Sequence, residues 1–129
     1  MSRLRIALMC LLLAGCGNVE VERYASEQPA LDLVAFFSGP VQAWGMVQNR
    51  SGEVTKRFHV RIDSRRDGER LILDERFVYS DGSRQQRTWT LTPDGDGRWR
   101  GEAGDVVGEA HGQVAGNALQ WRYRLDTPV

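Results

Sequence analysis

Apolar and polar residues alternate along most of the chain after Pro40, so that every second side chain is apolar. Such alternation, in runs rich in β-branched and aromatic residues, is typical of strands with one buried face. The runs cover residues 41–48, 54–63, 71–79, 84–92, 98–102, 106–114 and 118–125, with clusters of Gly, Asp, Asn and Ser between them. Because no helical period separates these seven runs, the sequence predicts an antiparallel meander.

The apolar residues before Pro40 have a different spacing. Leu31, Val34 and Phe37 repeat every three positions, which predicts a short helix, and Gly39-Pro40 predicts where it ends. Residues 16–30 are polar and have no sustained apolar period, which indicates a tether with little fixed structure. The predicted β domain therefore spans residues 31–129.

Two turns allow the register of their hairpins to be predicted. A two-residue Gly116-Asn117 turn pairs Val114 with Leu119, Gly112 with Trp121, Ala110 with Tyr123 and Glu109 with Arg124. A three-residue loop at residues 80–82 pairs Leu71 with Leu91, Leu73 with Trp89 and Glu75 with Arg87. A two-residue turn at 81–82 would instead set apolar residues against polar ones, so we predict the three-residue loop.

This register gives the sheet one apolar and one charged face. The apolar face carries Leu71, Leu73, Phe77, Tyr79, Trp89, Leu91, Trp121, Tyr123 and Leu125, with Phe58, Val60 and Ile62 from an earlier strand. The reverse face carries Arg57, His59, Arg61, Gln120, Arg122 and Arg124. We interpret it as a solvated face; contact with anionic headgroups or lipopolysaccharide is the alternative. Since closure removes unpaired edges, we expect the sheet to form a β-barrel rather than a sandwich.

The first residues carry a signal of another kind. Arg3 and Arg5 precede an apolar run of about eight residues, too short for a bilayer that needs roughly 20 in a helix. The stretch from Leu13 to Cys16 matches the lipobox of bacterial lipoproteins, which implies removal of residues 1–15 and acylation of the thiol and amine of Cys16. An ordinary secretory signal is the alternative. Gly17, in place of an Asp, favours the outer membrane, on its periplasmic side. If the source has a single membrane, the same signal implies the outer leaflet of that membrane.

Composition narrows the function further. Once Arg3 and Arg5 leave with the signal, fifteen basic residues stand against seventeen acidic ones, and a net charge of −2 argues against nucleic-acid binding. Cys10 and Cys16 are the only cysteines, so the exported domain has no disulfide. His59 and His111 have no second ligand nearby, and no serine lies in a nucleophile motif. We expect no enzyme activity, metal or cofactor.

The register brings two opposite charges, Glu75 and Arg87, onto the apolar face, where they are costly to desolvate. One interpretation is a structural ion pair near the open end of the barrel. In the other, Arg87 binds the carboxylate or phosphate of an amphipathic ligand whose tail lies along the aromatic interior. The candidate ligand-binding residues are Glu75, Tyr79, Arg87, Trp89, Trp121 and Tyr123. An envelope interaction module with a filled core and no ligand is the alternative function.

Several motifs extend over nearly the whole chain. They are the lipobox, Ala43-Trp44-Gly45, Asp74-Glu75-x-Phe77-x-Tyr79, Arg87-x-Trp89 and Gly116-Asn117-Ala118-x-x-Trp121. Together they resemble an uncharacterised bacterial lipoprotein family, domain of unknown function thirty-eight thirty-three. The resemblance implies no known activity, and because such proteins usually continue further, we expect this chain to lack the family's last strands. The helix before Gly39 and Trp44 is also similar to the opening of lipocalin-type barrels, in architecture only.

The lipoprotein interpretation predicts that Cys16 is the membrane anchor. Cys16→Ser should move the protein from the membrane pellet to the soluble fraction after a high-salt wash, which removes electrostatic contacts. Cell fractionation and immunoblotting measure this. A Cys16→Ser protein that stays in the washed pellet would show that the interpretation is wrong.

Overall fold

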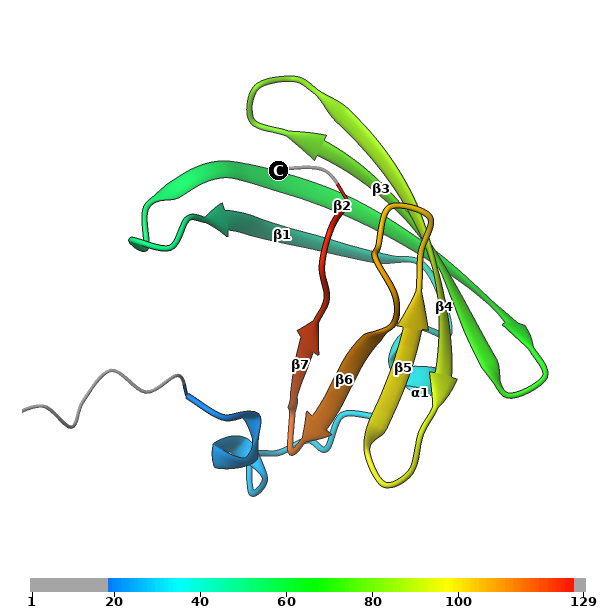
Figure 1. The fold of residues 1–129 in the computed structure, drawn as a ribbon. Helices are drawn as coiled ribbons and strands as arrows, with labels where there is room; N and C mark the ends of the chain where they lie inside the picture. Colours follow the sequence, from blue (N-terminus) through cyan, green and yellow to red (C-terminus); the bar gives the residue numbers. More distant parts are fainter. Residues whose placement is uncertain (1–18, 127–129) are drawn as a thin grey trace, which may run out of the picture.

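The structure of the protein, a computed structural model, describes residues 19–126, so the signal sequence and Cys16 lie outside the described residues. Seven antiparallel strands form one sheet in chain order (Figure 1). They are β1 Val41–Gln48, β2 Val54–Asp67, β3 Arg70–Tyr79, β4 Arg84–Pro93, β5 Arg98–Glu102, β6 Ala110–Ala115 and β7 Ala118–Arg122. The predicted all-β meander is confirmed.

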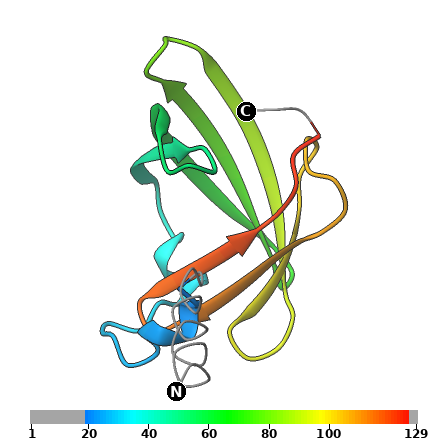
Figure 2. The ribbon, with the colours of Figure 1, turned by 60° about the vertical axis from the view of Figure 1, so that its left-hand side comes forward.

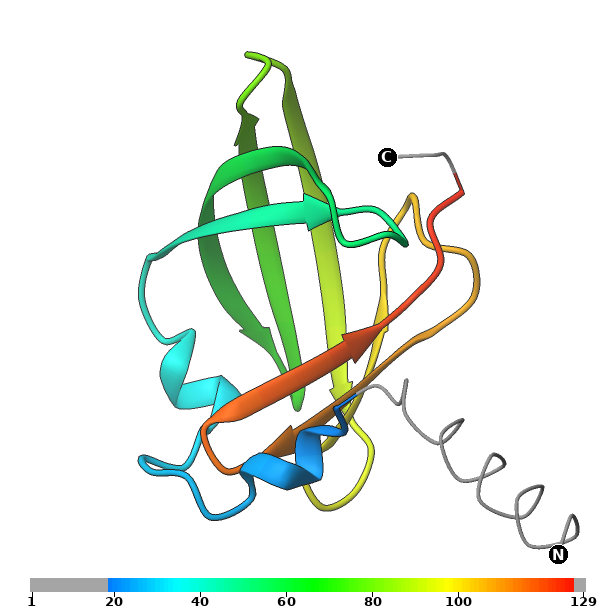
Figure 3. The ribbon, with the colours of Figure 1, turned by 90° about the vertical axis from the view of Figure 1, so that its left-hand side faces the viewer.

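The sheet curls into a half-barrel. Its two edge strands, β1 and β7, lie on the same side of the curled sheet (Figure 3), but no ladder joins them within residues 19–126. Strands β5 to β7 have five or six residues each, whereas β2 has 14 and β3 and β4 have 10. The expected β-barrel is therefore present in incomplete form in this part of the chain, because the short strands pair only with one another and with the end of β4.

The β3–β4 hairpin has the predicted register. Leu71 pairs with Leu91, Leu73 with Trp89 and Glu75 with Arg87. The loop between them is closed by a hydrogen bond of 2.9 Å from the Gly82 N–H to the Tyr79 carbonyl. Gly82 has a φ of 83°, a left-handed conformation that glycine adopts without strain.

The β6–β7 hairpin follows its predicted register only near the turn. Val114 pairs with Leu119 and Gly112 with Trp121, as predicted. The predicted pairs of Ala110 with Tyr123 and Glu109 with Arg124 are wrong. Beyond the end of β7 the chain pairs instead with residues 106–107, where the Val107 N–H donates to the Arg124 carbonyl. The cause is a turn over residues 104–108, which also delays the start of β6 to Ala110.

The N-terminal segment belongs to the folded domain from residue 19 onward, so the predicted unstructured tether is wrong for residues 19–30. Val21–Tyr24 forms a 3-10 helix, η1, which packs on β6 and β7 and buries Val21 (Figure 2). The Leu31 N–H donates to the Gly116 carbonyl over 2.8 Å. Gly116 is required there, because a side chain would collide with the Tyr24 carbonyl.

The predicted short helix is α1, Leu33–Phe36, at the lower end of the half-barrel (Figure 1). The Asp32 carboxylate caps it by accepting from the N–H groups of Val34 at 3.0 Å and Ala35 at 3.2 Å. Leu33 packs into the main core, which consists of Leu33, Leu71, Leu73, Trp89, Leu91 and Ala110.

Trp121 lies beside this core, where β5 and β6 each have a glycine. Its ring covers Gly101 and Gly112, and it meets the Trp89 ring edge-on at a centroid distance of 5.3 Å. A Cβ atom at Gly112 would overlap the Trp121 ring, whereas one at Gly104 would have no heavy atom within 4 Å. The two glycines therefore form a matched pair for a packing test.

Gly112→Ala should lower the free energy of unfolding by about 1–3 kcal/mol, because the methyl group forces the Trp121 ring out of its position. Gly104→Ala should leave it nearly unchanged. Urea denaturation of both variants measures the difference, and equal stabilities would show that Trp121 does not lie over Gly112.

Candidate functional site

The inner face of the half-barrel is incompletely covered by strands. The first half of β4 pairs with β3 but not with β5, which pairs with β4 only from Thr90 to Pro93. There the loop of residues 103–109 approaches β4 through the contact of Asp105 with Arg87. The side chains on this upper inner face are mainly aromatic. We call Phe58, Phe77, Tyr79, Trp89 and Tyr123 the aromatic cluster.

The rings of the aromatic cluster contact one another in two groups. Phe58 and Phe77 meet edge-on at 5.3 Å, and Phe77 stacks on Tyr79 at 5.8 Å. Tyr123 meets the ring of Trp89 edge-on at 5.2 Å. Phe77 and Trp89 are buried, whereas Tyr123 remains 41% exposed, so the cluster meets solvent at the Tyr123 ring.

Arg87 lies between the two groups. Its guanidinium carbon is 5.7 Å from the Phe77 ring centroid and 5.9 Å from those of Trp89 and Tyr123, within the range of cation–π attraction. The side chain is almost completely buried, with 8% exposure of the residue. A buried guanidinium needs a carboxylate partner.

That partner is Asp105, from the loop between β5 and β6. Arg87 Nε donates to Asp105 Oδ1 and Arg87 Nη2 to Asp105 Oδ2, each over 2.9 Å, in a bidentate pair. The hydrogen bonds from Arg87 lower the pKa of Asp105. The predicted structural ion pair between Glu75 and Arg87 is therefore wrong. The two residues are in register, but the carboxylate that binds the guanidinium of Arg87 belongs to Asp105 in the loop.

Two further residues extend this polar network. The Tyr79 hydroxyl donates to Gln85 Oε1 over 2.7 Å, and Gln85 Nε2 donates to Asp105 Oδ2 over 3.2 Å. Burial raises the pKa of Tyr79, so its hydroxyl stays protonated and acts as a donor. Asp105 thus accepts from both Arg87 and Gln85, and ties the loop to the inner face of β4.

Glu75 is the titratable group of this site near neutral pH. Burial raises its pKa to about 7, while the charge of Arg87 and a hydrogen bond from Trp89 act in the opposite direction. The bidentate contact with Asp105 leaves Glu75 without the strong ion pair that would keep it ionised. Below neutral pH it is therefore a neutral hydrogen-bond donor on an aromatic face.

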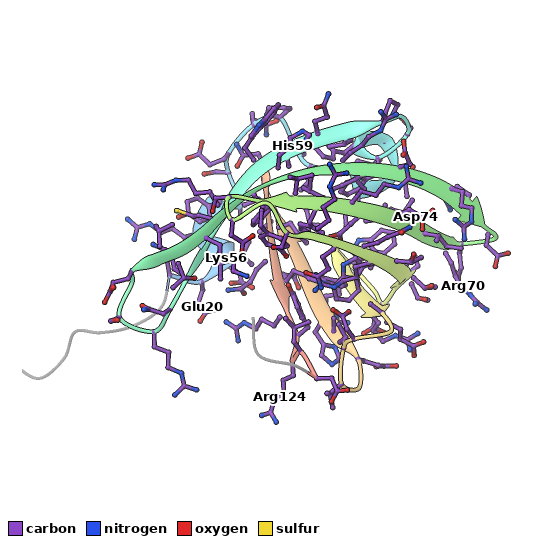
Figure 4. The ribbon with its side chains drawn as sticks, turned by 90° about the horizontal axis from the view of Figure 1, so that it is seen from above. Glu20, Lys56, His59, Arg70, Asp74 and Arg124 are labelled. Carbon is purple, nitrogen blue, oxygen red and sulfur yellow. The ribbon has the colours of Figure 1, made fainter. Side chains whose placement is uncertain are left out.

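Lys56, the only lysine of the chain, is a site residue that sequence reasoning missed. It lies on the inner side of β2, whereas His59 lies on the outer side (Figure 4). Lys56 Nζ is 5.2 Å from the Tyr79 ring centroid and 3.5 Å from Asp81. The available signal was its position two residues before Phe58, on the apolar side of the same alternation.

The other predicted residues divide between two places. Glu75, Tyr79, Arg87, Trp89 and Tyr123 come together on the upper inner face. Trp121 does not belong to this group, because its ring packs over glycines beside the main core.

Surface hollows occur at other positions. The most apolar of three, about 420 Å³, is lined by residues around α1, among them Pro29, Leu31 and Phe36. The other two are more polar and lie beside β4–β7, lined by residues such as Thr90 and Arg98. None of the six candidate ligand-binding residues lines any of these three hollows.

Between residues 19 and 126, no three His, Asp or Glu side chains are grouped as ligands for a metal ion. No helix in the same range has the length and apolar character needed to cross a membrane.

A protein family model matches residues 10–129, and its description is "Protein of unknown function (DUF3833)". The chain belongs to this family. The resemblance predicted from its motifs is thereby confirmed. No curated protein and no solved structure gives a significant match. The description of the family gives no function, so the geometry of the site is the available guide to what this protein does.

The raised pKa of Glu75 predicts a pH dependence of stability. Between pH 4.5 and about 7, Glu75 is ionised in the unfolded chain but protonated in the folded protein. The free energy of unfolding should therefore fall as the pH rises through this interval, and the contribution of Glu75 should be constant above about pH 7. Relative to Glu75→Gln, the wild type should lose roughly 3 kcal/mol over this interval.

Urea denaturation at pH 5 and pH 8 measures this difference, with Glu69→Gln, an exposed carboxylate in the β2–β3 turn, as the control. The lowered pKa of Asp105 affects stability only in more acidic solution, outside this interval. If wild type and Glu75→Gln change in parallel, Glu75 is ionised in the folded protein throughout.

Proposed function

We propose that this DUF3833 protein is a lipid-anchored protein of the cell envelope that binds an apolar or amphipathic, lipid-like ligand on the inner face of its half-barrel. The observation that carries the proposal is the aromatic cluster, which combines partly exposed rings with buried charged groups. An apolar surface with a few convergent polar groups is typical of ligand sites.

The anchor is assigned to Cys16 in the lipobox. Two residues, Gly17 and Asn18, separate Cys16 from Val19, where the described chain begins, and the span from Cys16 to Val19 reaches roughly 10 Å at most. Because η1 packs on β6 and β7, a lipidated Cys16 would hold the domain close to the membrane surface. Gly17 favours the outer membrane and its periplasmic side.

The ligand tail would lie along the rings of Phe58, Tyr79 and Tyr123. Tyr123 is the most exposed of these rings, and Tyr79 is half-buried and stacks on the buried ring of Phe77. Burial of an acyl chain against such rings contributes about 0.8 kcal/mol per methylene group.

The head group is assigned to Lys56 rather than Arg87. Asp105 occupies two donors of Arg87, so a ligand anion would have to displace a buried carboxylate contact. Lys56 is paired only with Asp81 among the described residues, at 3.5 Å in a half-exposed position where ion pairs are weak. A ligand carboxylate or phosphate competes with Asp81 at lower cost.

One observation favours a second candidate, an envelope interaction module without a ligand. The lower half of the inner face is filled by Leu71, Leu73, Trp89 and Leu91, and the hollows beside β4–β7 lie outside it. In that case the aromatic cluster is an extension of the core.

Uptake of a fluorescent fatty acid separates the two candidates. The chain from Gly17 onward should bind cis-parinaric acid, and Lys56→Met should weaken this binding roughly two- to fivefold, as expected for loss of one partly exposed ion pair. Binding of the methyl ester of the probe should be unchanged, since it has no charge. Fluorescence titration measures both.

Arg84→Met is the matched control, because Arg84 is an exposed cation at the start of β4 and lies on the outer face. If the wild type binds neither probe, the inner face is a filled core and the second candidate holds. Equal affinities of wild type and Lys56→Met for the acid would assign the head group to another residue.

A further inference from the structure

The outer face of β1–β4 exposes large apolar side chains that the core does not use. Trp44 is 75% exposed, Met46 56% and Val78 40%. Trp44 and Met46 point outward from the edge strand β1, and Val78 lies two strands away, with His59 between Trp44 and Val78 in the ladder. Such a group on one face is a feature of interaction surfaces.

Trp44 is held in its exposed position by its neighbours. Its ring packs on the His59 ring at a centroid distance of 5.0 Å, and His59 Nε2 is hydrogen-bonded to Gln42 Oε1 over 2.9 Å. The indole is therefore supported from one side and open to solvent on the other.

Arginines surround these apolar side chains. Arg57 pairs with Met46, and Arg84 with Val78. Arg61 and Arg76 stand directly opposite each other on neighbouring strands, an arrangement that is unfavourable unless an anion lies between or above them. Arg61 has Asp63 at 3.5 Å, but within residues 19–126 no carboxylate lies within 4.0 Å of Arg57, Arg76 or Arg84.

We propose that this face docks on an anionic phospholipid surface. Indole rings favour the headgroup level of a bilayer, and guanidinium groups bind phosphate while their alkyl chains cover apolar surface. The chain has no excess of basic residues overall, yet four arginines gather around one exposed Trp and Met. This charge complementarity favours an anionic membrane over an uncharged one.

The outer face is separate from the proposed ligand site, because successive side chains of the same strands point to opposite sides of the sheet. Its docking depends on the proposed Cys16 anchor only in that the anchor keeps the domain near the bilayer. The two proposals can therefore fail independently.

Trp44 reports on the docking directly. The full-length protein is purified from membranes and reconstituted into vesicles whose lipids carry brominated acyl chains, which quench tryptophan fluorescence at short range. Tryptophan quenching is compared between vesicles of phosphatidylcholine alone and vesicles that also contain phosphatidylglycerol. We expect at least threefold stronger quenching with phosphatidylglycerol, and loss of this excess in Trp44→Phe.

Charge is tested by replacing Arg57, Arg76 and Arg84 together with serine, which should abolish the excess quenching. The matched control replaces Arg23, Arg70 and Arg124 with serine, three exposed arginines elsewhere; Arg70 and Arg124 lie away from His59 (Figure 4). The control protein should be quenched like the wild type. The circular dichroism spectra of all variants should match that of the wild type, because the substitutions are on the surface.

Two results would overturn the proposal. The first is quenching that does not depend on phosphatidylglycerol or on Trp44. The second is equal quenching of Trp44 fluorescence by acrylamide in vesicles with and without phosphatidylglycerol. That result would favour a protein partner for this face. Failure of the Cys16 anchor is recognised separately, because protein without it would not float with phosphatidylcholine vesicles.

Discussion

The loop of residues 80–82 sets the register on which the core and both faces of the sheet depend. With Gly82 in a left-handed conformation, β3 and β4 pair so that Leu73 faces Trp89 and both point inward. A slip of one residue on either strand would turn its inward side chains to solvent, since the side-chain period of a strand is two. The same pairing sets Glu75 beside Arg87 and leaves Arg76 on the outer side next to Arg61.

The pairing of Arg87 with Asp105 then determines the electrostatics of the inner face. Because the loop carboxylate binds the guanidinium bidentately, the ion pair is internally neutral, and Glu75 is left with burial as the dominant influence on its pKa. A buried pair of this kind contributes little net stability compared with apolar packing, but loss of one partner is costly. It holds the loop of residues 103–109 against the part of β4 that does not pair with β5.

The two sides of the same strands support two separate proposals. Inward, aromatic rings and Lys56 form a surface suited to an amphipathic molecule. Outward, exposed Trp44 and the arginines Arg57, Arg76 and Arg84, which have no carboxylate within 4.0 Å in residues 19–126, form a surface suited to an anionic bilayer. The packing of η1 on β6 and β7 would hold both faces close to the proposed Cys16 anchor, since only Gly17 and Asn18 lie between Cys16 and the described chain.

Local pattern by itself determined the strands, their two faces, the registers of the turns at 80–82 and 116–117, and the family. These features depend on residues close in sequence, where the period of two and the turn residues act directly. Tertiary structure alone decided that Asp105 rather than Glu75 binds Arg87, that the segment before Leu31 packs on the sheet, and that Lys56 joins the aromatic cluster. It also decided that no ladder joins β1 to β7 within residues 19–126. Each of these depends on how the sheet curls and on where a loop crosses it, and no short-range period encodes contacts between residues that far apart.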